Sequence, residues 1–275
     1  MAYVFPGEGS LDYFPCQYGS SRVLFRGPRR QIDRAYVAVL GGTETYGKFV
    51  PVPFPDLIEL EIGLPVINLG CVNAGPDVFL NEASVTQIAA QASVTVVQIL
   101  GAQNLSNRYY AVHPRRNDRF LRATPLLRAI YPRVDFTEFN FTRHMLMSLQ
   151  ETSADKFEVL AEELRAAWVA RMKLLLSRLG RRVILLWVSD QPPPSPVRRV
   201  DLAHNPLLID KEMIYAIRTP VAAYVEAVLS SAALSQGVEG MAFAPMEAPA
   251  AAGLPGPAAH QEISDLLMPS IHRLI

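Results

Sequence analysis

Five short runs of the chain are almost wholly apolar and rich in β-branched residues. They span residues 35–41, 65–70, 93–101, 182–189 and 239–244. A strand with one solvated face alternates apolar and polar side chains, whereas a strand covered on both faces is apolar throughout. The pattern therefore predicts five buried strands in one sheet that carries helices on both faces.

Segments with helical spacing lie between these runs. The longest spans residues 153–179, begins with a capping-box pattern at residues 152–155 and is followed by Gly180, a common helix terminator. The other predicted helices span residues 56–62, 82–92, 219–234 and 261–275. Strands that alternate with helices favour right-handed crossovers, so the sheet is predicted to be mostly parallel.

The order of these elements predicts one α/β domain over residues 1–275, a three-layer α/β/α sandwich around a central five-stranded sheet. A chain of this length buries a large core in a single domain. Two stretches fall outside the core pattern: an irregular lead-in over residues 1–34, and an insertion over residues 102–152 between the third strand and its helix. Because the insertion is rich in aromatic residues and leucine, we expect it to be folded and to cover the crevice as a lid.

Composition narrows the classes of function. Lysine plus arginine and aspartate plus glutamate both number 26, and a protein without surplus positive charge is a poor candidate for binding nucleic acid or an anionic membrane. The two cysteines, Cys16 and Cys71, are too few for a disulfide framework or a zinc site. The first residues lack the pattern of a secretory signal, and the apolar runs are too short to cross a bilayer. We therefore expect a cytoplasmic protein without nucleic-acid or membrane partners, and a homo-oligomer stays open.

Polar, glycine-containing segments follow the first three predicted strands, and a similar segment precedes the last predicted helix. They are residues 41–47, 68–75, 101–107 and 256–260. In an open parallel sheet the ligand crevice lies beyond the carboxyl ends of the strands. We therefore expect these four segments to meet at one edge of the sheet and to form the functional site.

The four segments resemble, in order and position, the four sequence blocks of the SGNH (GDSL-type) hydrolases. Those blocks read Leu-Gly-Asp-Ser-x-Thr-x-Gly, Asn-x-Gly-x-x-Gly, Gly-x-Asn-Asp and Asp-x-x-His, and the resemblance implies the flavodoxin-like fold of that family. This chain departs from the family pattern at telling places. Thr43 stands for the nucleophilic serine, and Pro257 stands for the acid that orients His260. Either Gln103 or Asn104 stands for the oxyanion-binding asparagine.

The chain is also similar to a group of alphaproteobacterial proteins with no assigned activity. The shared segments are Gly-Gly-Thr-Glu-Thr-Tyr-Gly at residues 41–47 and His-Pro-Arg-Arg-Asn-Asp-Arg at residues 113–119. This second likeness implies a bacterial family but no reaction.

The first of two functional hypotheses is an SGNH-like esterase or acyltransferase of unknown substrate. In it the Thr43 hydroxyl attacks the substrate, and His260 acts as the general base that a hydroxyl nucleophile needs. Glu44, Asp201 or Glu262 would replace the missing acid, and His204, in Asp-x-x-His, is the alternative base. The groups implied for oxyanion binding are the backbone N–H of Thr43, the N–H of Gly70 or Gly75, and the side-chain amide of Gln103 or Asn104.

The second hypothesis is a catalytically inactive binding or interaction protein, a pseudoenzyme that keeps the scaffold and the crevice. The loss of both the serine and the orienting acid favours it. The glycines after the first strand then form a tight turn, Thr43 or Thr45 caps the following helix, and the asparagines satisfy loop backbone groups.

The insertion adds a basic cluster beside the third polar segment. Arginine forks suit carboxylate or phosphate oxygens, so the cluster predicts a small-molecule or glycan substrate with an anionic group, and a solvated basic turn is the alternative. The histidines of the insertion have no carboxylate or cysteine at metal-ligand spacing, so we expect no metal and no cofactor. The residues expected to bind substrate are Glu44, Thr45, Asn73, Arg108, His113, Arg115, Arg116 and His204.

Overall fold

The structure is a computed structural model that describes residues 9–196 and 201–275. Its central sheet has five parallel strands in the order β2-β1-β3-β6-β7. The strands are β1 (Val37–Gly41), β2 (Val66–Gly70), β3 (Val94–Gln98), β6 (Val183–Ser189) and β7 (Ala223–Val228). Counted within the sheet, this is the 2-1-3-4-5 order of flavodoxin-like doubly wound proteins, whose strand order reverses between the first and third strands. The predicted α/β/α sandwich with a parallel five-stranded sheet is confirmed.

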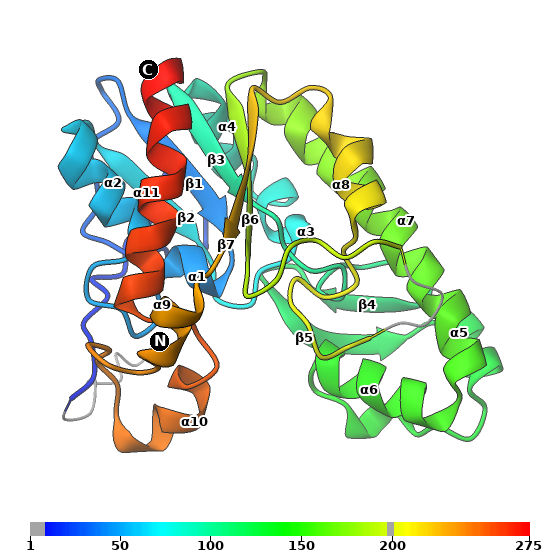
Figure 1. Cartoon of the computed structure of the whole chain (residues 1–275). Helices are drawn as coiled ribbons and strands as arrows, with labels where there is room; N and C mark the ends of the chain where they lie inside the picture. The colour runs from blue at the N-terminus through cyan, green and yellow to red at the C-terminus, as the bar shows by residue number, and fades with distance from the viewer. Residues whose placement is uncertain (1–8, 197–200) are drawn as a thin grey trace.

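Helices cover both faces of the sheet (Figure 1). Successive side chains of a strand point to opposite faces, which is why the strands are apolar throughout. In β1, Val37 and Val39 belong to the core beneath one helical layer, whereas Ala38 and Leu40 belong to the core beneath the other. The first layer consists of α2 (Phe54–Ile62) and α11 (Pro257–Leu274), and the second contains α4 (Ala83–Gln91), α7 (Ala154–Leu179) and α8 (Lys211–Arg218).

The C-terminal third corrects two sequence-based predictions. The predicted helix over residues 219–234 is instead strand β7 followed by α9 (Ser231–Ser235), and the predicted strand over 239–244 is a loop. That loop leads into η2 (Pro245–Glu247) and α10 (Ala248–Ala251). β7 is an edge strand that pairs with β6 alone, and Ala227 is the one buried residue among its six. Its sequence therefore lacks the signature of a buried strand, and pairing with β6 decides its conformation.

The insertion over residues 102–152 is folded, as predicted, and α8 is a helix that the sequence pattern did not predict. Aromatic side chains such as Tyr110, Phe120 and Phe136 pack against one another inside the insertion. They join the same apolar core as α7, so the insertion extends the second layer. Its elements are β4 (Tyr110–His113), β5 (Arg116–Ala123), α5 (Pro125–Ile130), η1 (Phe136–Glu138) and α6 (Thr142–Thr152).

The predicted lead-in is irregular over residues 9–34, apart from a single bridge between Cys16 and Phe25, and residues 1–8 lie outside the described part. Its buried Arg26 holds the segment after β1. The guanidinium donates to the carbonyl oxygens of Gly47 at 2.5 Å and Pro51 at 2.8 Å. This arginine therefore has a structural role close to the carboxyl end of the sheet.

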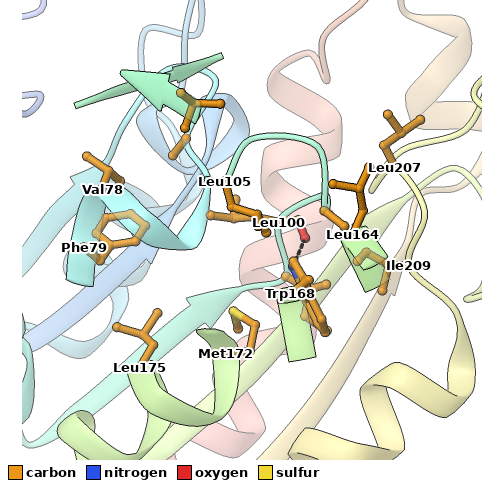
Figure 2. Close-up of a cluster of buried hydrophobic side chains, with 14 of the residues drawn as sticks. Val78, Phe79, Leu100, Leu105, Leu164, Trp168, Met172, Leu175, Leu207 and Ile209 are labelled. Carbon is orange, nitrogen blue, oxygen red and sulfur yellow. Dashed lines mark hydrogen bonds between the residues drawn. The ribbon is translucent and has the colours of Figure 1, made fainter. Parts of the chain in front are cut away.

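Trp168, in the middle of α7, fixes the segment that follows β3 (Figure 2). Its side chain is fully buried, and the indole Nε1–H donates to the carbonyl oxygen of Leu100 at 2.8 Å. A buried carbonyl that lost this partner would be left without a hydrogen bond. The apolar side chains labelled around it in Figure 2 are Val78, Phe79, Leu100, Leu105, Leu164, Met172, Leu175, Leu207 and Ile209.

We expect Trp168→Ala to lower the free energy of unfolding by about 3–5 kcal/mol, because the substitution leaves a cavity and removes a buried hydrogen bond. Urea denaturation followed by circular dichroism measures this change. Leu174→Ala on the same helix is the control, since Leu174 is 42% exposed, and it should cost less than about 1 kcal/mol. Equal losses in both variants would contradict a central role for Trp168.

Candidate functional site

Thr43 begins the short helix α1 (Thr43–Tyr46), directly after β1 and at the point where the strand order reverses. Its buried hydroxyl oxygen accepts a hydrogen bond from the backbone N–H of Asn73 at 2.9 Å and donates one to the Asn73 side-chain oxygen at 3.3 Å. Asn73 follows β2 and has a positive φ of 54°, in the left-handed region that asparagine tolerates. The structure therefore brings Thr43 and Asn73 together, as expected.

Further hydrogen bonds connect Asn73 to the third segment and the insertion. The side-chain amide of Asn104 donates to the carbonyl oxygen of Asn73 at 2.9 Å. The hydroxyl of Thr142 in turn donates to the side-chain oxygen of Asn104 at 2.6 Å. Asn73 also donates to the carboxylate of Asp118, at 3.2 Å. The loops after β1, β2 and β3 thus share one polar network.

Gln98, the last residue of β3, holds the start of α1, which contains Glu44 and Thr45. Its side-chain oxygen accepts from the backbone N–H of Gly42 at 2.9 Å and from the Thr45 hydroxyl at 2.7 Å. Its amide nitrogen donates to the carboxylate of Glu44 at 2.8 Å. The sequence-based reasoning missed Gln98, although a polar residue at the end of an apolar strand was a usable signal.

The two glycines expected to bind an oxyanion have partners already. The N–H of Gly70 donates to the Asn68 side chain at 2.9 Å, and the N–H of Gly75 donates to the Asn117 side chain at 3.1 Å. Asn117, on β5, is fully buried and was not predicted as a site residue. A Cβ on Gly75 would overlap the carbonyl oxygen of Asn104, so this glycine permits a close approach of two loops.

His260 lies in the interface between α11 and α2. It is 1% exposed, its Nδ1 accepts the backbone N–H of Phe54 at 3.0 Å, and its ring stacks on the Phe54 ring with centroids 5.9 Å apart. Burial lowers the pKa of His260 to about 3, and the positive charge of Arg26 adds to that shift. The structure does not bring His260 and Thr43 into hydrogen-bond contact, because each has other partners in the part of the chain that is described.

The three acids considered as partners of His260 bond elsewhere. Glu44 bonds to Gln98, and Glu262 accepts from the backbone N–H of Ser230 at 2.9 Å. Asp201 pairs with His204, whose Nε2 lies 3.3 Å from a carboxylate oxygen of Asp201.

The expected anion clamp of the insertion is not assembled. Arg108 pairs with Glu163 on α7 at 2.8 Å. The ring nitrogen of His113 accepts the backbone N–H groups of Arg115 and Arg116, each at 3.2 Å, so this histidine stabilises the hairpin turn. Both arginines are exposed. Gln103 contributes its backbone carbonyl to a bond from Tyr110, while its side-chain oxygen is buried and has no hydrogen-bond partner.

A cavity of about 270 Å³, the strand-end pocket, opens beyond the carboxyl ends of β6 and β7. It contains Glu44 from α1 and His204 from the loop after β6, two of the predicted substrate-binding residues. The loop before α11 closes one side. Its lining consists of Glu44, Val188, Ser189, Asp190, Ala203, His204, Asn205, Leu229, Ala233, Leu234, Gly237, Ala252, Gly253, Leu254, Pro255 and Gly256.

A second cavity of about 430 Å³, the Arg165 cavity, lies on the other side of His204. The two cavities share Ser189, His204 and Asn205, and the Ser189 hydroxyl donates to the carbonyl oxygen of Asn205 at 2.7 Å. The other lining residues are Arg165, Trp187, Gln191, Pro192, Pro194, Ser195, Asp201, Pro206, Leu208, Ile209 and Asp210.

Residues 9–196 and 201–275 contain neither a candidate metal cluster nor a candidate membrane span. In these residues, no group of three or more histidine, cysteine, aspartate or glutamate side chains is placed to hold a metal ion. No helix within the same ranges combines the length and the apolar character that a membrane span requires.

The fold and the site define a doubly wound α/β/α protein whose strand-end loops are joined by side-chain amides. The chain belongs to the family described as "Domain of unknown function (DUF6473)", whose model matches residues 1–275. No curated protein matches the sequence.

Among solved structures, the chain is similar to lipases and esterases. The lipase Lip_vut3 from a goat rumen metagenome shares 12% identity over 86% of this chain and 97% of that chain, with a TM-score of 0.45. A lipase/acylhydrolase from Enterococcus faecalis shares 14% identity over 88% and 98% of the two chains, with a TM-score of 0.43. A carbohydrate esterase family 2 enzyme from Corynascus thermopiles (Myceliophthora fergusii) shares 11% identity over 90% and 69%, with a TM-score of 0.44. Likenesses at this level carry no conclusion about activity.

The buried His260 makes stability depend on pH. Its pKa is about 3 in the folded chain and 6.5 ordinarily, so between these values the unfolded chain binds a proton that the folded chain excludes. This contribution is fully present above about pH 6.5 and is lost as the pH falls toward 3. We expect the wild-type chain to lose about 2 kcal/mol of unfolding free energy from this group between pH 7.5 and pH 5.

Urea unfolding at both pH values, compared with His260→Gln, isolates that contribution. Glutamine retains an acceptor for the Phe54 N–H but does not titrate, so the variant should lose about 2 kcal/mol less than the wild type between the two pH values. Identical pH dependence in the two chains would show that His260 is accessible to protons in the folded state.

Proposed function

We propose that this protein is a small-molecule-binding protein on an SGNH-hydrolase-like scaffold, and that it does no covalent chemistry at Thr43. The ligand occupies the strand-end pocket. The proposal rests on one observation: the expected nucleophile and the expected base bond to different residues. The Thr43 hydroxyl is hydrogen-bonded to Asn73, and the buried His260 is hydrogen-bonded to the backbone N–H of Phe54.

A threonine hydroxyl attacks an ester only when a neighbouring base accepts its proton. The Thr43 hydroxyl donates to the side-chain oxygen of Asn73, and an amide oxygen is not a base of that kind. An oxyanion hole also needs donors that are free to face the developing charge. The N–H groups of Gly70 and Gly75 are bonded to asparagine side chains instead. Because the Thr43 hydroxyl and the two glycine N–H groups are bonded within the protein, they support a binding function rather than catalysis.

The charge of the strand-end pocket defines the class of ligand. Glu44 and Asp190 contribute carboxylates, Ser189 and His204 add polar groups, and no lysine or arginine occurs among the described residues of the lining. Gln98 holds the Glu44 carboxylate in place. Carboxylates in a lining without cations attract hydroxyl and ammonium donors and repel anions. The ligand is therefore a small molecule rich in hydrogen-bond donors, such as an amino sugar, without net negative charge.

Turnover of p-nitrophenyl acetate tests the absence of covalent chemistry. We expect the wild-type chain, Thr43→Val and His260→Gln to give the same background rate, within about twofold. Loss of a wild-type activity in both variants would contradict the proposal and restore the esterase hypothesis with Thr43 as nucleophile. An activity lost only in His204→Ala would also contradict it, by showing catalysis that uses the other histidine.

Binding measurements with three sugars test the ligand class. By nuclear magnetic resonance titration we expect glucosamine to bind more tightly than N-acetylglucosamine, and glucuronate to bind least, because of the carboxylates in the pocket. Glu44→Gln keeps an acceptor for Gln98 but removes the charge, so it should weaken glucosamine binding about tenfold.

Glu61→Gln is the matched control, because Glu61 is exposed on α2 and lies outside the pocket. It should bind glucosamine as the wild type does. Equal affinity for all three sugars, or equal weakening by both variants, would contradict recognition by Glu44.

A further inference from the structure

The Arg165 cavity differs in chemistry from the strand-end pocket. Most of its wall is apolar, with contributions from Trp187, Leu208, Ile209 and the prolines 192, 194 and 206. The indole N–H of Trp187 donates to the carbonyl oxygen of Gln191 at 2.9 Å, so the hydrogen-bonding need of this side chain is met within the protein. The cavity therefore offers an apolar surface of a size that ordinary small-molecule ligands occupy.

Arg165 is the unusual residue of this wall. It lies on α7 and its side chain is partly buried. Its Nε is fully buried without a hydrogen-bond partner, and the guanidinium forms no ion pair within the described residues. Buried charged groups in proteins are almost always paired, because an unpaired one costs free energy. At the wall of an apolar cavity, an Nε–H without a partner among the described residues is a donor that a ligand can use.

The acidic residues of the same cavity do not neutralise Arg165. Asp210 caps α8, where its carboxylate accepts the backbone N–H of Met213 at 2.9 Å. Asp201 accepts the backbone N–H of Ala203 at 2.7 Å and pairs with the ring of His204. Both carboxylates thus have other bonding partners, and neither forms an ion pair with Arg165 among the described residues.

We infer that the Arg165 cavity binds a small carboxylic acid with an aromatic or acyl body, and that Arg165 holds its carboxylate. A planar guanidinium matches a carboxylate through two parallel hydrogen bonds. The apolar wall around Trp187 accommodates the body of the ligand. This site is separate from the strand-end pocket, whose Glu44 and Asp190 repel an anion, so either site can fail without the other.

Calorimetric titration with 3-phenylpropionate tests the assignment, with 3-phenylpropionamide and inorganic phosphate as comparison ligands. The carboxylate should bind at least tenfold more tightly than the uncharged amide, and phosphate should bind more weakly than the carboxylate. Arg165→Met should weaken 3-phenylpropionate binding at least tenfold and leave binding of the amide unchanged. Arg115→Gln, which removes an exposed arginine of the insertion, should leave both affinities unchanged.

Several outcomes would overturn the assignment. They are equal affinity for the acid and the amide, unchanged binding in Arg165→Met, and phosphate binding as tight as that of the carboxylate. Loss of binding in Arg115→Gln would place the anion in the insertion instead. A thermal unfolding measurement controls for misfolding. Because the Nε of Arg165 has no hydrogen-bond partner among the described residues, Arg165→Met should unfold at the same temperature as the wild type or higher. A clearly lower midpoint would show that the arginine is paired within the protein.

Discussion

The hydrogen bonds of Asn73 hold the carboxyl edge of the sheet together. One residue bonds to Thr43 after β1, to Asn104 after β3 and to Asp118 on the insertion. Parallel strands deliver these loops to the same edge but leave their backbone groups without ladder partners, and buried backbone groups must find partners somewhere. Asparagine supplies both a donor and an acceptor and tolerates the positive φ that Asn73 adopts. The polar residues after the strands therefore have a structural role that does not depend on a ligand.

This architectural use has a chemical consequence. A group that binds a ligand or a reacting atom needs a donor or acceptor that is not already bonded within the protein. At the carboxyl ends of β1, β2 and β3, the Thr43 hydroxyl, the asparagine amides and the glycine N–H groups are already bonded. Two charged side chains outside this network line cavities instead. The Glu44 carboxylate is held by Gln98 and lines a pocket, and the buried Nε of Arg165 has no hydrogen-bond partner among the described residues. In a fold of this kind, the unsatisfied side chain is a better guide to a site than the residue that matches a sequence block.

The sequence predicts this fold well where burial is complete and poorly where it is partial. Four strands are apolar on both faces, and each was found within its predicted range, whereas the half-exposed edge strand β7 was mistaken for a helix. The positions of the polar segments can also be predicted from the sequence, because each predicted strand also predicts where the strand ends. The hydrogen-bond partners of these polar residues cannot be predicted from the sequence, since they depend on the direction in which each side chain points. His260 sits on the helical face that packs on α2, and Gln98 and Asn117 complete the loops from elements that the block pattern does not include.

The net charge of the chain is zero, but acidic and basic side chains are unevenly distributed between the two cavities. Ser189, His204 and Asn205 form a common wall between an acidic pocket and a cavity with an unpaired guanidinium. His204 and Asn205, which follow β6 along the chain, thus contribute to the lining of both cavities. A small molecule with an ammonium or hydroxyl group is attracted to one side of the wall and a carboxylate to the other, because the sign of the nearest charge outweighs a neutral total at these distances. The ligands that we propose for the two cavities therefore follow from local charge, and the net charge of the chain does not predict them.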